Sequence, residues 1–188
     1  MTFTEIRNTL TEAISKAVGV PVILSDQVSP EAAVPFIIYS VTTPYAPTGE
    51  QGDYSLDYNR DEVGEVTSVT NRRREQPSAT FSFTACSENR WVGEEGQETY
   101  IHGEDEAHDI ADRAIGFLLH GGYQELATEG IVIVEVTNAG NRTTLVIDEA
   151  ARRYGFDARI RYTRDDTRTD GIVLHVNTIQ KRSEQQNA

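Results

Sequence analysis

The sequence has little cysteine and no long apolar run. Cys86 is the only cysteine among 188 residues, which excludes an intrachain disulfide framework and a cysteine-based metal cluster. No apolar run approaches the roughly 20 residues that a membrane-spanning helix needs, and no charged-then-apolar leader opens the chain. We therefore expect a soluble, unsecreted protein that makes no contact with a membrane.

Positive charge is also scarce, and lysine is scarcest. The formal net charge is −13 and the pI is near 4.7, which disfavours binding to nucleic acid, because phosphates are held mainly by lysine and arginine. Lys16 and Lys181 are the two lysines among 17 basic residues, so 15 are arginines. Arginine forms bidentate pairs with carboxylates and tolerates desolvation, so this bias favours protein interfaces.

The length and the apolar content fit one globular domain spanning residues 1–188. Residues 43–77 differ from the rest, because proline and glycine punctuate a stretch that is acidic in its middle and basic at its end. We expect an arm, a long hairpin or a disordered insert there. We expect the tail at 181–188 to fray.

Two segments show helical periodicity. Thr2 and Glu5 have the spacing of a capping box, apolar residues then recur at three- and four-residue steps, and Gly19 ends the pattern. A second amphipathic pattern spans 104–119, with Gly121 beyond its end. Each helix has one apolar face, which predicts that both pack on a sheet.

The remaining apolar segments indicate strands. The alternation at 78–85 is the clearest, and 131–136 reads as a central strand buried on both faces. Further strands are expected at 21–24, 35–42, 144–147 and 152–163, where Ala158, Ile160 and Tyr162 face inward. Residues 165–171 are expected to turn the chain into a last strand at 172–179. These elements predict an α+β fold with a mostly antiparallel mixed sheet packed by two α-helices, plus the polar arm.

No credible active site is found. His102 and His108 lie among four acids, but a second pair of ligands at metal spacing is missing, and acids in a first helical turn are explained by the helix dipole. Cys86 has an acidic neighbour where a nucleophile needs a basic one. Asp165, Asp166 and Asp170 lack the full ligand pattern of a calcium loop. We therefore expect no enzyme, cofactor or metal, with a small metal-dependent hydrolase using His102 and His108 as the alternative.

Several segments stand out by their order and separations: REQPSATFSFTACS, the helix beginning near Asp105, IVIVEVTNAGNRTTLVIDEAARRYGFDARIRYT and the closing hairpin. Together they resemble the neck and tail-terminator proteins of tailed bacteriophages. The similarity spans roughly residues 5 to 180. Its most distinctive parts are the arginine, proline and Phe-x-Phe element at 74–83 and the Arg-Tyr-Gly-Phe-Asp element at 153–157.

The resemblance implies a structural virion protein that is assembled in the host cytoplasm and located in the tail neck. It implies a ring, commonly a hexamer, that ends growth of the tail tube and joins the tail to the head. The implied partners are further copies of the chain, the tail-tube protein and the head connector or head-completion protein, with genomic DNA only passing through the lumen. An acidic lumen would repel phosphates. Another ring-forming neck component, either a head-completion or a tail-tube protein, is the main alternative.

A ring needs two different edges that meet on neighbouring subunits. We expect the outward arginines of segment 152–170 to face the acid-rich stretch 88–106 of a neighbour, because bidentate pairs fix orientation. A charge ladder within one chain, across the final hairpin, would explain the same arginines equally well. The basic run at 72–74 fits a charged edge or partner contact better than nucleic acid. The interface candidates are Arg72, Arg73, Arg74, Arg153, Arg159, Arg161, Arg164, Glu94, Glu95 and Glu98.

Overall fold

The computed structural model describes residues 2–25, 33–49, 51–143 and 151–171. The chain divides into two compact units. The first unit comprises Met1–Gly52 and Glu75–Arg164, and the second comprises Asp53–Arg74 and Asp165–Ala188. The expected strands at 144–147 and 172–179 and the tail at 181–188 lie outside the described residues.

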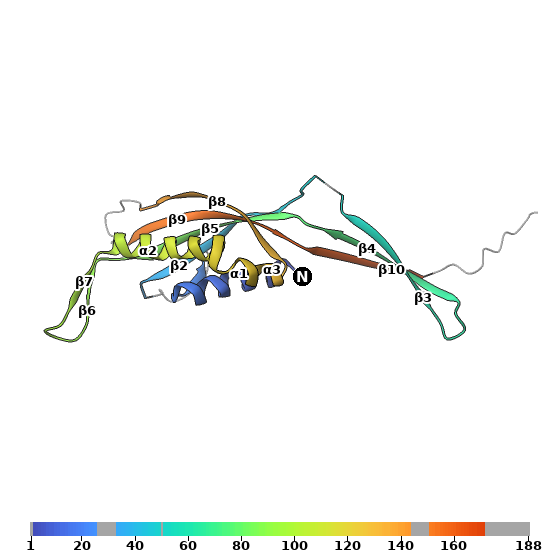
Figure 1. Ribbon diagram of the computed structural model, residues 1–188, viewed down its shortest axis with the longest axis horizontal. Helices are drawn as coiled ribbons and strands as arrows, with labels where there is room; N and C mark the ends of the chain where they lie inside the picture. The colour runs from blue at the N-terminus through green and yellow to red at the C-terminus, as the bar shows by residue number, and fades with distance from the viewer. Residues whose placement is uncertain (1, 26–32, 50, 144–150, 172–188) are drawn as a thin grey trace, which may run out of the picture. The chain divides into compact units, whose positions relative to one another are not determined.

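A five-stranded sheet forms the centre of the first unit (Figure 1). Its strand order is β1-β2-β5-β9-β8. The bounds are β1 Val22–Leu24, β2 Phe36–Ala46, β5 Ser78–Ser87, β9 Arg152–Tyr162 and β8 Ile131–Asn141. Only the β1–β2 pair is parallel among these strands, so the predicted mixed and mostly antiparallel sheet is confirmed.

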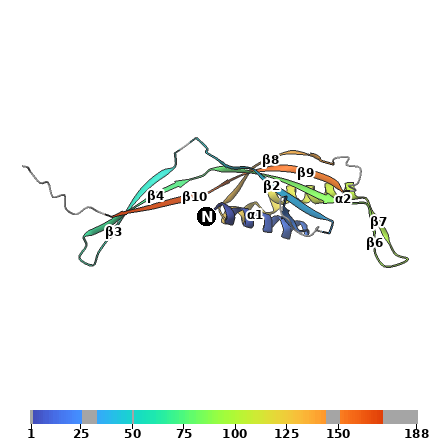
Figure 2. The same cartoon turned by 180° about the vertical axis from the view of Figure 1, so that it is seen from behind.

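The helices of this unit lie on one side of the sheet in both views (Figures 1 and 2). They are α1 Phe3–Val18, α2 Gly103–Gly116 and the short α3 Tyr123–Thr128, and a π-helical turn, η1 Phe117–Gly121, continues α2. The capping box is confirmed, since the Thr2 backbone N–H donates to Glu5 Oε2 at 2.7 Å. The sequence did not predict α3. Its one buried side chain is Leu126, and a single buried position cannot show a helical periodicity.

Aromatic side chains fill the core between the helices and the sheet. Phe3, Phe81, Phe83 and Phe156 stack in succession, with ring centroids 5.9, 6.1 and 5.5 Å apart. The alternation predicted for residues 78–85 is confirmed, because Ala79, Phe81, Phe83 and Ala85 are buried. The inward positions expected along 152–163 are confirmed as well, since Ala158, Ile160 and Tyr162 are buried while Arg159 and Arg161 are exposed.

The prediction of a central strand at 131–136 was wrong. Strand β8 stands at the edge of the described sheet, and its Val132 and Val134 are each 38% exposed. A bulge between Ile133 and Glu135 interrupts the pairing with β9. The apolar run therefore reflects one buried face and an exposed apolar stripe on the other, and periodicity alone cannot separate these two cases.

The second unit contains a three-stranded sheet of order β10-β4-β3. The bounds are β3 Asp53–Arg60, β4 Val66–Glu75 and β10 Arg164–Gly171. Strands β3 and β4 form a hairpin inside segment 43–77, where the sequence predicts an arm, a long hairpin or a disordered insert. The predicted turn at 165–171 was wrong, because these residues form β10 beside β4. Asp165 and Asp166 of β10 pair with Arg74 and Arg73 of β4, which explains this acidic pair without a turn.

A second hairpin belongs to the first unit. Strands β6 Arg90–Val92 and β7 Thr99–Ile101 pair antiparallel between β5 and α2. Gly93 and Gly96 both have positive φ and shape the connection between the two strands. No helix among the described residues is long and apolar enough to cross a membrane.

Candidate functional site

The Arg-Tyr-Gly-Phe-Asp element has a structural explanation in Arg142. The Arg142 guanidinium crosses the sheet face opposite the helices and donates to Ser82 Oγ at 2.6 Å and to Asp157 Oδ1 at 2.9 Å. Gly155 lies beneath it, and a Cβ there would come within 2.7 Å of Arg142 Cδ and 2.6 Å of the Phe83 carbonyl oxygen. In this motif, Gly155 leaves room for the Arg142 side chain, Phe156 packs in the core and Asp157 forms the ion pair with Arg142.

Asp157 is held in its charged form by this network. Burial raises the pKa of the Asp157 carboxyl, but hydrogen bonds from Asn138, Ser82 and Arg142 lower it by more, so the pKa lies below its usual value. Asn138 reaches the carboxylate at 2.6 Å from a backbone with φ of 52°, which asparagine tolerates. The cluster fixes the irregular end of β8 onto β9.

The outward arginines of β9 have different surroundings. Arg159 Nε lies 2.9 Å from Glu135 Oε1, and these two residues are register partners on β9 and β8. This is an ion pair across neighbouring strands of one chain, although not across the final hairpin expected from the sequence. Arg161 is exposed, its register partner is Val132, and no acidic residue among those described pairs with it.

The acid-rich stretch 88–106 contains the β6–β7 hairpin, and its base is locked to α2. Arg90 makes a two-pronged contact with Glu106, with Nη1 to Oε2 at 2.7 Å and Nη2 to Oε1 at 2.9 Å, and the Ser87 hydroxyl donates to the same carboxylate. The hydrogen bonds from Arg90 hold the pKa of Glu106 below its usual range against the opposing effect of burial. Asn89 Oδ1 accepts from the Gly103 N–H at 2.9 Å.

Exposed aromatics and acids occupy the rest of this hairpin. The Trp91 and Tyr100 rings pack edge to face with centroids 5.0 Å apart, and Trp91 is 67% exposed. Glu94, Glu95 and Glu98 are exposed at the tip. The sequence singled out these three glutamates but missed the two aromatics, although Trp91 is the one tryptophan of the chain and tryptophan is enriched in interface hot spots.

The three arginines of the basic run pair within the second unit. Arg73 Nη1 lies 3.2 Å from Asp166 Oδ2, Arg74 Nε lies 2.8 Å from Asp165 Oδ1, and Arg72 lies 3.9 Å from Asp57 on β3. The hydrogen bond from Arg74 lowers the pKa of the Asp165 carboxyl. Residues 73 and 74 contact 166 and 165 in reverse order, so β4 and β10 run antiparallel.

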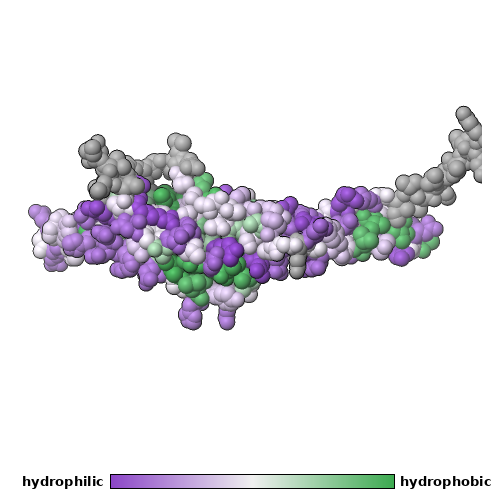
Figure 3. All heavy atoms as spheres, turned by 90° about the horizontal axis from the view of Figure 1, so that it is seen from above, coloured by the Kyte–Doolittle hydropathy of each residue, from purple (hydrophilic) through white to green (hydrophobic). Residues whose placement is uncertain are grey.

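The sheet of the second unit has one polar and one partly apolar face. Tyr54, Leu56 and Tyr58 alternate along β3 and pair with residues of β4 that include Val69, so these side chains share a face. The tyrosines and the leucine are all more than half exposed. Figure 3 shows hydrophobic surface within this unit.

Two further candidates have partners close by. The Arg164 guanidinium lies 3.8 Å from the buried carboxylate of Glu75 and 5.7 Å from the ring centre of Tyr45. The Tyr45 hydroxyl donates to that carboxylate at 3.1 Å. Arg153 is half-buried, and its backbone N–H donates to the Thr143 hydroxyl at 2.9 Å.

The histidines of the hydrolase alternative do not converge. The His102 ring packs on Tyr100 and the His108 ring packs on Tyr154, with centroids 4.8 and 4.6 Å apart. Within the described part of the chain, no three His, Cys, Asp or Glu side chains are grouped to hold a metal ion. Cys86 is buried in β5.

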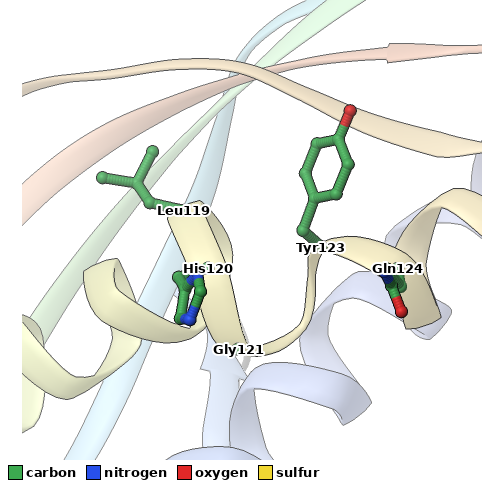
Figure 4. A pocket seen from close by; sticks show the side chains of 5 residues that line it. All are labelled: Leu119, His120, Gly121, Tyr123 and Gln124. Carbon is green, nitrogen blue, oxygen red and sulfur yellow. The ribbon is translucent and has the colours of Figure 1, made fainter.

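A surface pocket near η1 also lacks converging groups. It is lined by Leu119, His120, Gly121, Tyr123 and Gln124. Leu119 and Tyr123 point to one side of the helical turn, whereas His120 points to the other (Figure 4). The described residues therefore offer charged and aromatic surfaces, and neither the two histidines nor this pocket brings together a set of metal-binding groups.

Comparison with known proteins agrees with the resemblance in the sequence. A family model described as phage neck terminator protein matches residues 8–186. No curated protein matches the chain.

Proposed function

The chain belongs to the phage neck terminator protein family, and we propose that it acts in the phage neck as a closed ring of identical copies. We propose a hexamer at the head-proximal end of the tail, which ends growth of the tail tube and joins the tail to the head connector. The role is structural rather than catalytic. The observation that carries this proposal is the family match, which covers both units rather than one segment.

The charge distribution supports passage of DNA through such a ring. The chain has a net charge of −13, and several of its arginines are already engaged by carboxylates of the same chain, including Arg142, Arg159 and Arg74. These pairs reduce the attraction of the chain for DNA, because a paired guanidinium attracts phosphates weakly. We propose that the lumen lets genomic DNA pass without binding it, and that the ring contacts the tail-tube protein on one side and a head-completion or connector protein on the other.

The test is a phage in which the gene for this chain is disrupted. The expected particles are unjoined: filled heads without tails, and tails whose tubes lack a terminating ring or exceed normal length in electron micrographs. Supplying the chain from a plasmid restores joined particles. Normal, infectious particles in its absence would overturn the proposal.

A second experiment separates the terminator from other neck components. A tagged copy of the chain, located by antibody labelling in electron micrographs, is expected between the tail tube and the head connector. Label along the whole tube would identify a tube subunit instead, and label on tailless heads alone would identify a head-completion protein.

A further inference from the structure

We propose that the β6–β7 hairpin of one copy docks on the β8 edge of the next copy, with Trp91 as its anchor and Arg161 as the cation that its glutamates meet. The inference rests on the proposed ring and names the surfaces that would close it.

The β6–β7 hairpin exposes Trp91 and Tyr100 from a fixed base. Its base is held to α2 by the two-pronged contact between Arg90 and Glu106 and by the bond from Gly103 to Asn89, so little order is lost on binding. Beyond that base, Trp91 and Tyr100 are exposed and support each other edge to face. A rigid, exposed tryptophan beside a tyrosine is the composition that dominates binding energy in protein interfaces.

The hairpin also requires a cationic acceptor. Glu94, Glu95 and Glu98 are exposed on the connection between β6 and β7, and none of the described residues forms an ion pair with them. The chain as a whole is acidic, so most of its own surface repels this hairpin. Docking is therefore confined to a place where an arginine has no acidic partner.

Arg161 provides such a place. It is exposed, and the described residues give it no carboxylate, whereas its neighbour Arg159 is already paired with Glu135. Its register partner Val132 and the nearby Val134 are exposed on the edge strand β8. A guanidinium beside apolar side chains matches a hairpin that carries an exposed tryptophan and an acidic tip, because the indole can stack on the cation and the acids can pair with it.

The two surfaces lie at opposite ends of one strand. Ser78, at the start of β5, is the register partner of Arg161, whereas Ser87, at its end, leads into the hairpin. The nine steps from Ser78 to Ser87, at about 3.4 Å each, separate the two ends by about 30 Å. Unlike, complementary surfaces at the two ends of one strand give a heterologous contact, which closes into a ring when the rotation between copies permits.

The experiment uses two variants of the full-length chain, Trp91→Ala on the hairpin and Arg161→Glu on the acceptor. Sedimentation velocity compares each with the wild type, and circular dichroism checks the fold, which exposed positions leave intact. Each variant alone is expected to need more than about tenfold higher concentration to assemble, as for truncation of a central aromatic anchor. Tyr123→Ala removes another exposed aromatic and is expected to assemble like the wild type.

Mixing the two variants tests whether these surfaces meet each other. The intact hairpin of the Arg161→Glu chain can dock on the intact acceptor of the Trp91→Ala chain, and growth then stops because both remaining surfaces are defective. The mixture is therefore expected to form dimers that neither variant forms alone. If the mixture stays monomeric, or if either variant assembles like the wild type, the proposed interface is wrong, although the proposed ring of copies still stands. A wild-type chain that stays monomeric overturns the ring itself.

Discussion

Arg142 Nη2 lies 2.9 Å from Asp157 Oδ1, and this ion pair passes directly over Gly155. The contact connects the end of β8 to the middle of β9 on the sheet face that carries no helix. It explains why a glycine stands in the most distinctive motif of the sequence, because any side chain there would displace Arg142. The motif therefore maintains the sheet on which the proposed assembly surfaces are placed.

Gly155→Ala is expected to destabilise the fold by about 1 to 3 kcal/mol, the usual cost of forcing atoms into a filled space. The added Cβ would meet the Phe83 carbonyl oxygen at 2.6 Å, and a backbone atom cannot move aside cheaply. Urea unfolding measures the effect. Gly140→Ala is the matched control, since Gly140 is the register partner of Gly155 but has no atom within 4 Å of its added Cβ. Equal losses in both variants would contradict the explanation.

The hairpin base makes stability depend on pH. The folded pKa of Glu106 lies below its usual value, and so does that of Asp157. A lowered folded pKa stabilises the protein above the unfolded pKa, near pH 4, and the contribution is lost as the pH falls through the folded value. The free energy of unfolding is therefore expected to be level from neutral pH to about pH 5 and to fall steeply below pH 4.

Glu106→Gln isolates the contribution of the hairpin base. It should destabilise the protein at pH 7 by about 1 to 3 kcal/mol, because it leaves the half-buried Arg90 without its anionic partner. It should also flatten the fall in stability below pH 4. A variant with the same pH profile as the wild type would show that the Glu106 carboxylate contributes nothing to it.

The charge pairs of the second unit make a separate prediction. Asp165→Asn combined with Asp166→Asn removes the anions that pair with Arg74 and Arg73 across β10 and β4. Amide hydrogen exchange is expected to speed up in residues 66–74 and to stay unchanged in β5. Asp170→Asn is the control, because Asp170 pairs with Arg168 of its own strand, so its loss removes no contact between strands. Unchanged exchange in the double variant would show that backbone pairing alone holds the sheet.

Much of the first unit could be predicted because its signals are local. The capping box at Thr2 and Glu5 and the alternation around Phe81 and Phe83 depend on neighbouring residues only, and both are confirmed. Strand β10 could not be predicted in this way. Its aspartates resemble a turn until Arg73 and Arg74, more than 90 residues upstream, are known to lie beside them.

The candidate surfaces were only partly predictable for the same reason. The sequence indicated that the arginines of β9 and the glutamates near the hairpin matter, but it could not assign partners. Glu135 pairs with Arg159 because a bulge in β8 places the two residues opposite each other. The hydrophobic pattern of the sequence does not reveal such a bulge. The exposure of Trp91 likewise depends on the hairpin as a whole, since a tryptophan in a short strand is more often buried.

The last prediction separates Arg159 from Arg161. Arg159→Ala should change monomer stability by less than about 1 kcal/mol, because its ion pair with Glu135 is exposed, and it should leave the ring intact. Arg161→Ala should also leave a folded monomer but weaken assembly, and Arg161→Lys should restore only part of it, since an ammonium cannot fork onto carboxylates or stack on an indole as a guanidinium does. Sedimentation and circular dichroism on the same samples measure both properties. If the two alanine variants assembled equally well, β9 would carry an ordinary charged face and the acceptor surface would have to lie elsewhere.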